Sequence, residues 1–347
     1  MATFSSIKRM ADDPNLTCIP PSYVFQIEQA AVHLDDVEGG EETIPIIDYS
    51  LLTSGTREQR TKIIQDLRYA CQEWGFFMVI NHGVNEGLMK RMLKSCKEFF
   101  HLTEEEKMEF QDKHVLDPIR YGTSFNASVD DIFFWRDYLK VKVHPEFHSP
   151  DKPTGFRQVL EEYAKAVRVI VRGLLGGISE SLDLDSDCIG RALDIESSLQ
   201  ILTANLYPPC PQPGLAMGFP PHSDHGLLTM LIHNGISGLQ IQHRGKWVSV
   251  DGLPNAFLVN TGDHMEILSN GKYKSVLHRA TVNNKATRIS IATSNGPSPE
   301  AVVSPVHDLL ENGCSPAGYI GMKYKDYLEL QQSNKLDGKS CLDRVKV

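Results

Sequence analysis

The chain has 347 residues, of which 41% are hydrophobic, and its formal net charge is −9. The acidic balance and the lack of a dense Lys/Arg run argue against a nucleic-acid-binding protein, because that affinity depends on clustered positive charge. No apolar run of about 18 residues predicts a membrane span, and residues 1–15 lack the apolar core of a signal peptide. We therefore expect a cytoplasmic monomer that acts on a small molecule, with no nucleic-acid or membrane partner.

The first half of the chain is predicted to be mostly helical. Residues 1–43 are irregular and acidic toward their end, which indicates an N-terminal arm. A short strand is expected at 44–48, a helix that opens with a Thr56/Gln59 capping box, a buried strand at 76–80, and a long helix at about 156–182. Residues 44–198 are therefore interpreted as a mostly helical N-terminal domain.

The apolar pattern changes to a period of two after about Ser198. Alternating segments at 199–207, 239–242, 247–250, 256–260 and 288–293 are separated by Gly, Pro and Asn, and the second and third predict a hairpin. Helices followed by antiparallel strands are typical of an α+β fold. Residues 199–300 are long enough for a double-stranded β-helix, the jelly roll of the cupins, and residues 301–347 are expected to form a helical C-terminal extension and lid.

The metal chemistry is predicted from His222-Ser223-Asp224, which follows a Pro/Gly-rich loop. On a strand, residues two apart face the same way, so His222 and Asp224 can meet one ion. A third ligand must come from elsewhere, and His278 is the leading candidate. Two imidazoles and one carboxylate form the facial triad of non-haem iron(II) oxygenases, which leaves open positions for a cosubstrate and dioxygen.

A second pair of residues predicts the cosubstrate. Arg288 and Ser290 lie ten and twelve residues beyond His278 and would share one face of a strand. The guanidinium fork of Arg288 suits a carboxylate, and Ser290 adds a hydroxyl donor. A dicarboxylate between the metal and Arg288 would be chelated at one end and clamped at the other, which fits the shape of 2-oxoglutarate.

Other interpretations of the same residues remain open at this point. An isolated HxD pair is weak evidence, and zinc accepts the same ligands, so a zinc hydrolase is an alternative. A binding protein on the same scaffold that has lost turnover is another. Asp263 and His264 resemble a site but are interpreted as part of a turn after Gly262, and His225 is expected to face away from His222 on a strand.

Longer motifs resemble a known family along residues 44–342. The motifs that carry the resemblance are Ile44-Pro45-Ile46-Ile47-Asp48, Trp74-Gly75-Phe76-Phe77, Asn81-His82-Gly83-Val84, Asn205-Leu206-Tyr207-Pro208-Pro209-Cys210-Pro211, Asn260-Thr261-Gly262-Asp263 and the stretch from Ser269 to Arg279. In these segments the chain is similar to the plant soluble iron(II)- and 2-oxoglutarate-dependent dioxygenases. That group includes flavanone 3-hydroxylase, flavonol and anthocyanidin synthases, hyoscyamine 6-hydroxylase and gibberellin oxidases.

The resemblance implies roles for particular residues and a set of cofactors. His222, Asp224 and His278 fall on the family's iron ligands, Arg288 and Ser290 on its carboxylate clamp, and Tyr207 and Asn205 on positions that approach the cosubstrate. The implied reagents are Fe(2+), 2-oxoglutarate and O2, with ascorbate as the reductant used in vitro. The implied reaction releases succinate and CO2 and most commonly hydroxylates a small specialised metabolite, although desaturases and demethylases use the same site.

The substrate pocket is expected over the metal, with apolar and aromatic walls. A flavonoid, terpenoid, steroid or alkaloid would suit such walls. The expected lining residues are Tyr121, Thr123, Phe125 and Phe134 in the N-terminal domain, and Tyr319 and Met322 at the start of the C-terminal lid.

Overall fold

The computed structural model of the protein describes residues 6–25, 43–111, 113–125, 130–311, 316–333, 335 and 338–347. Part of the predicted irregular arm is structured, because helix α1 (Ile7–Ala11) lies within it. Ile7 and Tyr23 are buried against Trp135 and Cys210, so residues 6–25 pack on the body of the protein. Most of the acidic stretch of the arm lies outside the described residues.

Two helices begin at capping boxes, and the one at Thr56 was predicted from the sequence. Thr56 caps α3 (Arg57–Tyr69) and Thr103 caps α5 (Glu104–Lys107), each through a reciprocal capping box. The long helix α6 (Phe156–Ser181) confirms the prediction from apolar periodicity. The other helices are α2 (Tyr49–Ser54), α4 (Glu86–Phe100), α7 (Cys188–Ala192), α8 (Asp263–Leu268), α9 (His307–Glu311), α10 (Tyr324–Ser333) and α11 (Ser340–Asp343).

The strands of the described residues form one large sheet, one small sheet and a separate two-stranded pair. The eight-stranded sheet has the order β1-β2-β10-β7-β12-β5-β4-β3, and the four-stranded sheet has the order β6-β11-β8-β9. The strands of the large sheet are β1 (Ile46–Asp48), β2 (Phe76–Ile80), β10 (Phe257–Thr261), β7 (Leu228–His233), β12 (Arg288–Asn295), β5 (Gln200–Tyr207), β4 (Asp137–His144) and β3 (Ile119–Thr123). Those of the small sheet are β6 (Phe219–His222), β11 (His278–Ala280), β8 (Leu239–His243) and β9 (Lys246–Val250), while β13 (Val302–Val303) and β14 (Met322–Lys323) form a separate pair.

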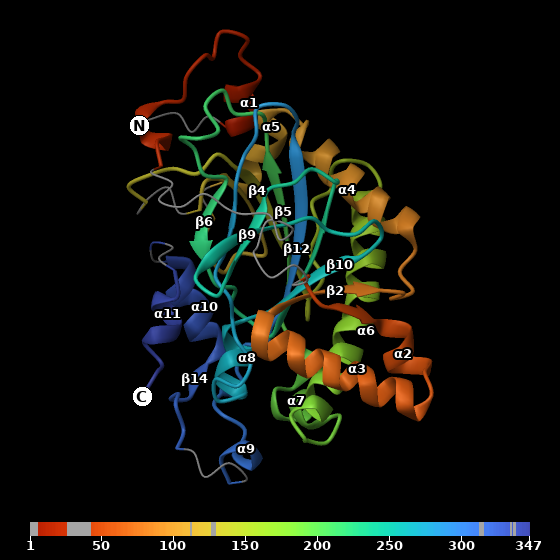
Figure 1. Ribbon diagram of the computed structural model, residues 1–347. Coiled ribbons are helices and arrows are strands. Elements are labelled where there is room, and N and C mark those ends of the chain that lie inside the picture. Colours follow the sequence, from red (N-terminus) through yellow and green to blue (C-terminus); the bar gives the residue numbers. More distant parts are fainter. Residues whose placement is uncertain are drawn as a thin grey trace.

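Side-chain alternation assigns each face of the large sheet its role. Ile289 and Ile291 on β12 join Leu202 and Leu206 on β5 in the main core, on the side covered by α4 and α6 (Figure 1). The residues between them along the chain face the small sheet, and side chains of both sheets line one cavity. This arrangement confirms the predicted α+β fold with a jelly-roll core.

The strands β3 and β4 were not predicted, although both lie before residue 198. They extend the large sheet beyond β5, and β1 and β2 extend it at the other edge. Strands from both sides of residue 198 share the large sheet. The division of the chain into two domains at this residue stays a prediction. No described helix has the length and apolar character needed to cross a membrane.

Candidate active site

Two histidines and one aspartate converge between the sheets. His222 ends β6 and His278 begins β11, and the two are paired directly across the strands, with ring centroids 4.2 Å apart. Asp224 Oδ1 lies 3.6 Å from His222 Nε2 and 3.7 Å from His278 Nε2. Among the described residues, these three form the group of potential metal ligands, with their ligand atoms within 4.8 Å of one another.

The geometry corrects one step of the sequence argument. His222 and Asp224 were expected to share one face of a strand, but β6 ends at His222. Asp224 instead lies in the segment that follows, where its backbone carbonyl accepts a hydrogen bond of 2.8 Å from the Asp263 amide. A turn, rather than strand alternation, therefore brings the carboxylate to the histidines.

Hydrogen bonds and charge set the protonation of the three groups. Nδ1 of His222 lies 2.8 Å from the Pro220 carbonyl and Nδ1 of His278 lies 3.1 Å from the Val276 carbonyl, so each Nδ1 donates to a backbone carbonyl and each Nε2 is directed at Asp224. Burial and the adjacent His278 lower the pKa of His222 to about 3. Burial opposes ionisation of Asp224, yet His278 and His222 lower its pKa to about 2. Neutral imidazoles and an ionised carboxylate are the forms that bind a divalent metal, and hydrogen bonds of this kind orient histidine ligands.

Asp224 is also held from its other oxygen. Asn260 on β10 donates a hydrogen bond of 2.9 Å from Nδ2 to Asp224 Oδ2. Oδ1 is thereby left facing both histidines. The donor set and its fixed orientation fit a single metal ion.

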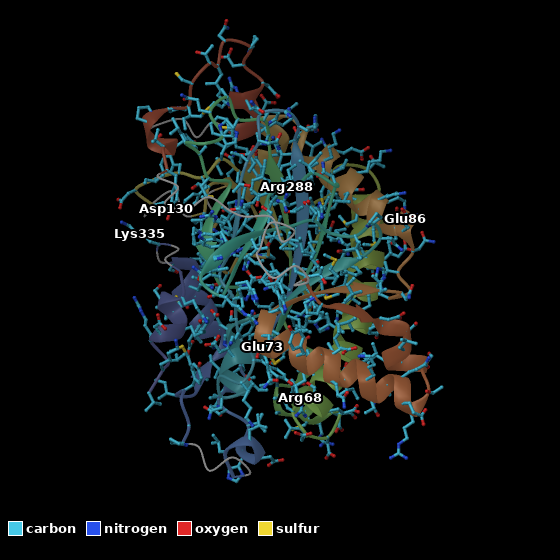
Figure 2. All side chains as sticks on the ribbon, in the orientation of Figure 1. Arg68, Glu73, Glu86, Asp130, Arg288 and Lys335 are labelled. Atoms are coloured by element: carbon cyan, nitrogen blue, oxygen red, sulfur yellow. The ribbon has the colours of Figure 1, made fainter. Side chains whose placement is uncertain are left out.

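A buried cation lies in the same cavity. Arg288 and Ser290 begin β12 and are each 2% exposed, and their side chains are joined by a hydrogen bond of 3.4 Å from Arg288 Nη1 to Ser290 Oγ. The strand register places Tyr207 opposite Arg288 and Asn205 opposite Ser290 on β5. Arg288 lies in the interior among the strands (Figure 2), and its Nε has no hydrogen-bond partner among the described residues. A buried guanidinium with an unmet donor suits a bound carboxylate.

The competing histidines are not part of this group of ligand atoms, although His225 also lines the cavity. His225 is not on a strand; it is buried, with Nδ1 2.8 Å from the Tyr324 hydroxyl. The predicted turn at Asp263 is wrong, because α8 begins there, and both Asp263 and His264 are buried. Tyr327 donates a hydrogen bond of 2.7 Å to Asp263 Oδ2, which gives this aspartate a packing role.

The expected substrate-lining residues separate into two groups. Phe125 lines the cavity and packs against Phe219. Tyr121 and Thr123 on β3 point to the other side of the sheet, because they alternate with Arg120, which lines the cavity. The three remaining residues lie outside the cavity lining: Phe134 packs against Phe219 and Phe25, Tyr319 donates a hydrogen bond to Glu266, and Met322 packs on the main core.

Several residues that line the cavity were not predicted from the sequence. Gln331 and Gln332 line the cavity from the end of α10, so the C-terminal segment contributes through this helix. Three cations, Arg120, Arg136 and Lys140, line it from the β3–β4 side. Alternation of Leu139, Val141 and Val143 with lysines is a strand signal that could have predicted this inward face.

Known protein families and relatives match this chain in sequence. Residues 198–297 match the 2OG-Fe(II) oxygenase superfamily, and residues 44–162 match the non-haem dioxygenase in morphine synthesis N-terminal family. The chain is 44% identical to 2-oxoglutarate-dependent dioxygenase 19 of Oryza sativa subsp. japonica, over 92% of this chain and 95% of that protein. The chain belongs to the 2OG-Fe(II) oxygenase superfamily.

Further members of the superfamily resemble the whole chain. Thebaine 6-O-demethylase of Papaver somniferum is 36% identical over 95% of this chain and 92% of its own length. The crystal structure of JOX2 in complex with 2OG, Fe, and JA superposes with a TM-score of 0.88 at 29% identity, covering 99% of this chain and 98% of that one. The protein is thus a plant-type 2-oxoglutarate-dependent dioxygenase, an oxidoreductase whose family uses Fe(2+), 2-oxoglutarate and O2.

Proposed function

We propose that His222, Asp224 and His278 hold the iron(II) of this dioxygenase. The observation that supports the assignment is the convergence of two histidine Nε2 atoms on one carboxylate oxygen, at 3.6 and 3.7 Å. Iron(II), when bound, supplies the redox chemistry that couples decarboxylation of 2-oxoglutarate to oxidation of a C–H bond. The protein disfavours protonation of His222 and keeps Asp224 ionised, and Asn260 fixes the direction of Asp224.

Arg288 and Ser290 are proposed to bind the distal carboxylate of 2-oxoglutarate. The buried guanidinium has one donor, Nε, without a hydrogen-bond partner among the described residues, and Ser290 lies on the same strand face. Tyr207 and Asn205, in register with this pair, would bound the cosubstrate from β5. The cosubstrate would then lie with one end at the triad and the other at the start of β12.

The primary substrate is proposed to be a small specialised metabolite that is hydroxylated. Phe76, Phe125, Tyr138 and Phe219 give the cavity aromatic walls suited to a flat apolar body, such as that of a flavonoid, terpenoid, steroid or alkaloid. O-Demethylation, the reaction of the similar poppy enzyme, is a second candidate, because hydroxylation of a methyl ether gives a hemiacetal that breaks down to the free hydroxyl and formaldehyde. We also infer a cytoplasmic monomer that binds no nucleic acid; the net charge of −9 supports the absence of nucleic-acid binding.

One assay tests the proposal against its alternatives. The protein is incubated with iron(II), 2-oxoglutarate, ascorbate and a plant metabolite panel under air, and succinate and product masses are followed. We expect succinate and a product that gains one oxygen atom or loses a methyl group. Absence of succinate with every compound would favour a binding protein without turnover, and a product formed by water addition without dioxygen would favour a zinc hydrolase.

A further inference from the structure

Two cations face each other across neighbouring strands on the wall of the cavity. Arg120 on β3 is paired directly with Lys140 on β4, and both side chains line the cavity. Like charges directly opposite each other destabilise a sheet, so this basic pair needs a compensating interaction. The partners that the structure gives it are neutral: Arg120 donates to the Tyr138 hydroxyl at 3.4 Å, and Lys140 donates to Gln332 Oε1.

The cavity carries more positive than negative charge. Asp224 is the one carboxylate among its described lining residues, whereas Arg120, Arg136, Lys140, Arg279 and Arg288 are cations. Burial, together with Arg120 and Arg136, holds the pKa of Lys140 well below its ordinary value. If the proposed metal and cosubstrate are bound, a divalent cation and Arg288 balance Asp224 and a dicarboxylate, so the basic pair still lacks a counter-charge.

The basic pair and Arg288 lie on separate parts of the large sheet. Lys140 pairs with Thr203, and Thr203 pairs with Ala292, so Lys140 lies two strands away from β12 and level with Ala292. Ala292 is four residues beyond Arg288, which with the strand spacing places the Lys140 and Arg288 backbones roughly 16 Å apart. Arg288 and the basic pair therefore extend into the cavity from two separate parts of the large sheet.

We propose that Arg120 and Lys140 form an anion subsite that binds the carboxylate of the substrate, so that the protein oxidises a small organic acid. This proposal rests on the proposed function and names its substrate class. The acid would place its carboxylate on the basic pair and its apolar body along Phe125 and Phe219 toward the triad. Arg136 supports this wall, because it bonds to the Ser124 carbonyl and Asn205 and its guanidinium carbon lies 3.8 Å from the Phe219 ring centroid.

The first test needs no knowledge of the substrate. Lys140→Gln keeps a polar partner for Gln332 and removes a buried amine whose charged form is opposed by burial and by Arg120, so we expect the ligand-free protein to melt about 1–3 °C higher than the wild type. The matched control is Lys142→Gln, two residues along the same strand. Lys142 lies outside the cavity lining, and it already donates to the Leu116 carbonyl beside Asp117. We expect no rise for the control, whereas an unchanged or lower melting temperature for Lys140→Gln would overturn the proposal.

The second test uses matched acids and amides. Benzoate, cinnamate and larger aromatic or terpenoid acids are each compared with the primary amide of the same shape, for stimulation of succinate release and for thermal stabilisation. We expect the active or stabilising members to be acids. Loss of the carboxylate, or Lys140→Gln, should raise the half-saturating concentration roughly ten- to a hundred-fold, the worth of a charge-assisted hydrogen bond.

The outcomes separate the two proposals. Amides that work as well as their acids would overturn the anion subsite and leave the dioxygenase proposal intact. Failure of the wild type to bind 2-oxoglutarate, measured without substrate under anaerobic conditions, would instead defeat the proposed function. If no compound in the panel binds, the melting temperature of Lys140→Gln still decides the subsite.

Discussion

Asp224 is the residue on which the proposed metal site depends most. It supplies the only carboxylate among the described cavity residues, and Asn260 holds its second oxygen at 2.9 Å. We expect Asp224→Ala to abolish turnover and to lower the iron content of the purified protein, because the negative ligand is lost. Asp66→Ala on the exposed face of α3 is the control and should retain both. Normal iron content together with full activity in Asp224→Ala would refute the ligand assignment.

Arg288 carries the prediction for the cosubstrate. Its side chain is buried, and its position opposite Tyr207 leaves the guanidinium facing the cavity. We expect Arg288→Ala to raise the half-saturating concentration of 2-oxoglutarate roughly ten- to a hundred-fold, which is the loss of a charge-assisted hydrogen bond. Arg288→Lys should give a smaller increase, because it keeps the charge and loses the fork. An unchanged requirement in both variants would mean that another cation binds the cosubstrate.

At the scale of helices and strands, the sequence predicted those features that depend only on interactions between neighbouring residues. Thr56 and Gln59 predicted the start of α3, because a capping box is complete within four residues. Asp224 was predicted as a ligand but placed on the wrong element, since the turn after β6 depends on its contact with Asp263. Gln331 carried no signal at all, because its place at the cavity depends on how α10 packs against segments far away in sequence.

The packing of α10 gives a prediction for one glycine. A Cβ at Gly296, just after β12, would fall on the ring of Tyr324, which is fully buried at the start of α10 and contacts His225. We expect Gly296→Ala to lower the free energy of unfolding by about 1–3 kcal/mol, because the ring must move in a packed interior. Gly214→Ala, where no atom lies within 4 Å, should change it by less than about 0.5 kcal/mol. Equal stabilities of the two variants in urea would contradict the packing described for α10.

At the scale of the whole molecule, Asp137 joins the N-terminal segment to the large sheet. Its Oδ1 accepts a hydrogen bond of 2.8 Å from the Ile7 amide and its Oδ2 one of 2.9 Å from the Lys8 amide, across about 130 residues of chain. Burial nevertheless raises the pKa of Asp137 to about 6 from its ordinary 3.8, because the cost of burying the charge exceeds the gain from these two bonds. No sequence pattern predicted this contact, since both amides belong to a segment interpreted as irregular.

The raised pKa fixes the sign of a pH dependence. At pH 5 the carboxyl of Asp137 is protonated in the folded protein but ionised in the unfolded chain. This proton uptake stabilises the folded state, and the stabilisation is lost as the pH rises through 6. The Asp137→Asn variant has no ionisable group at this position. Subtracting its free energy of unfolding from that of the wild type removes the pH dependence of other groups, such as Asp263, whose pKa burial also raises to about 6. We expect the wild type minus Asp137→Asn difference to fall by roughly 1.5 kcal/mol between pH 5 and pH 8 in urea unfolding. A flat or rising difference would show that the amides of Ile7 and Lys8 stabilise the carboxylate more than burial destabilises it.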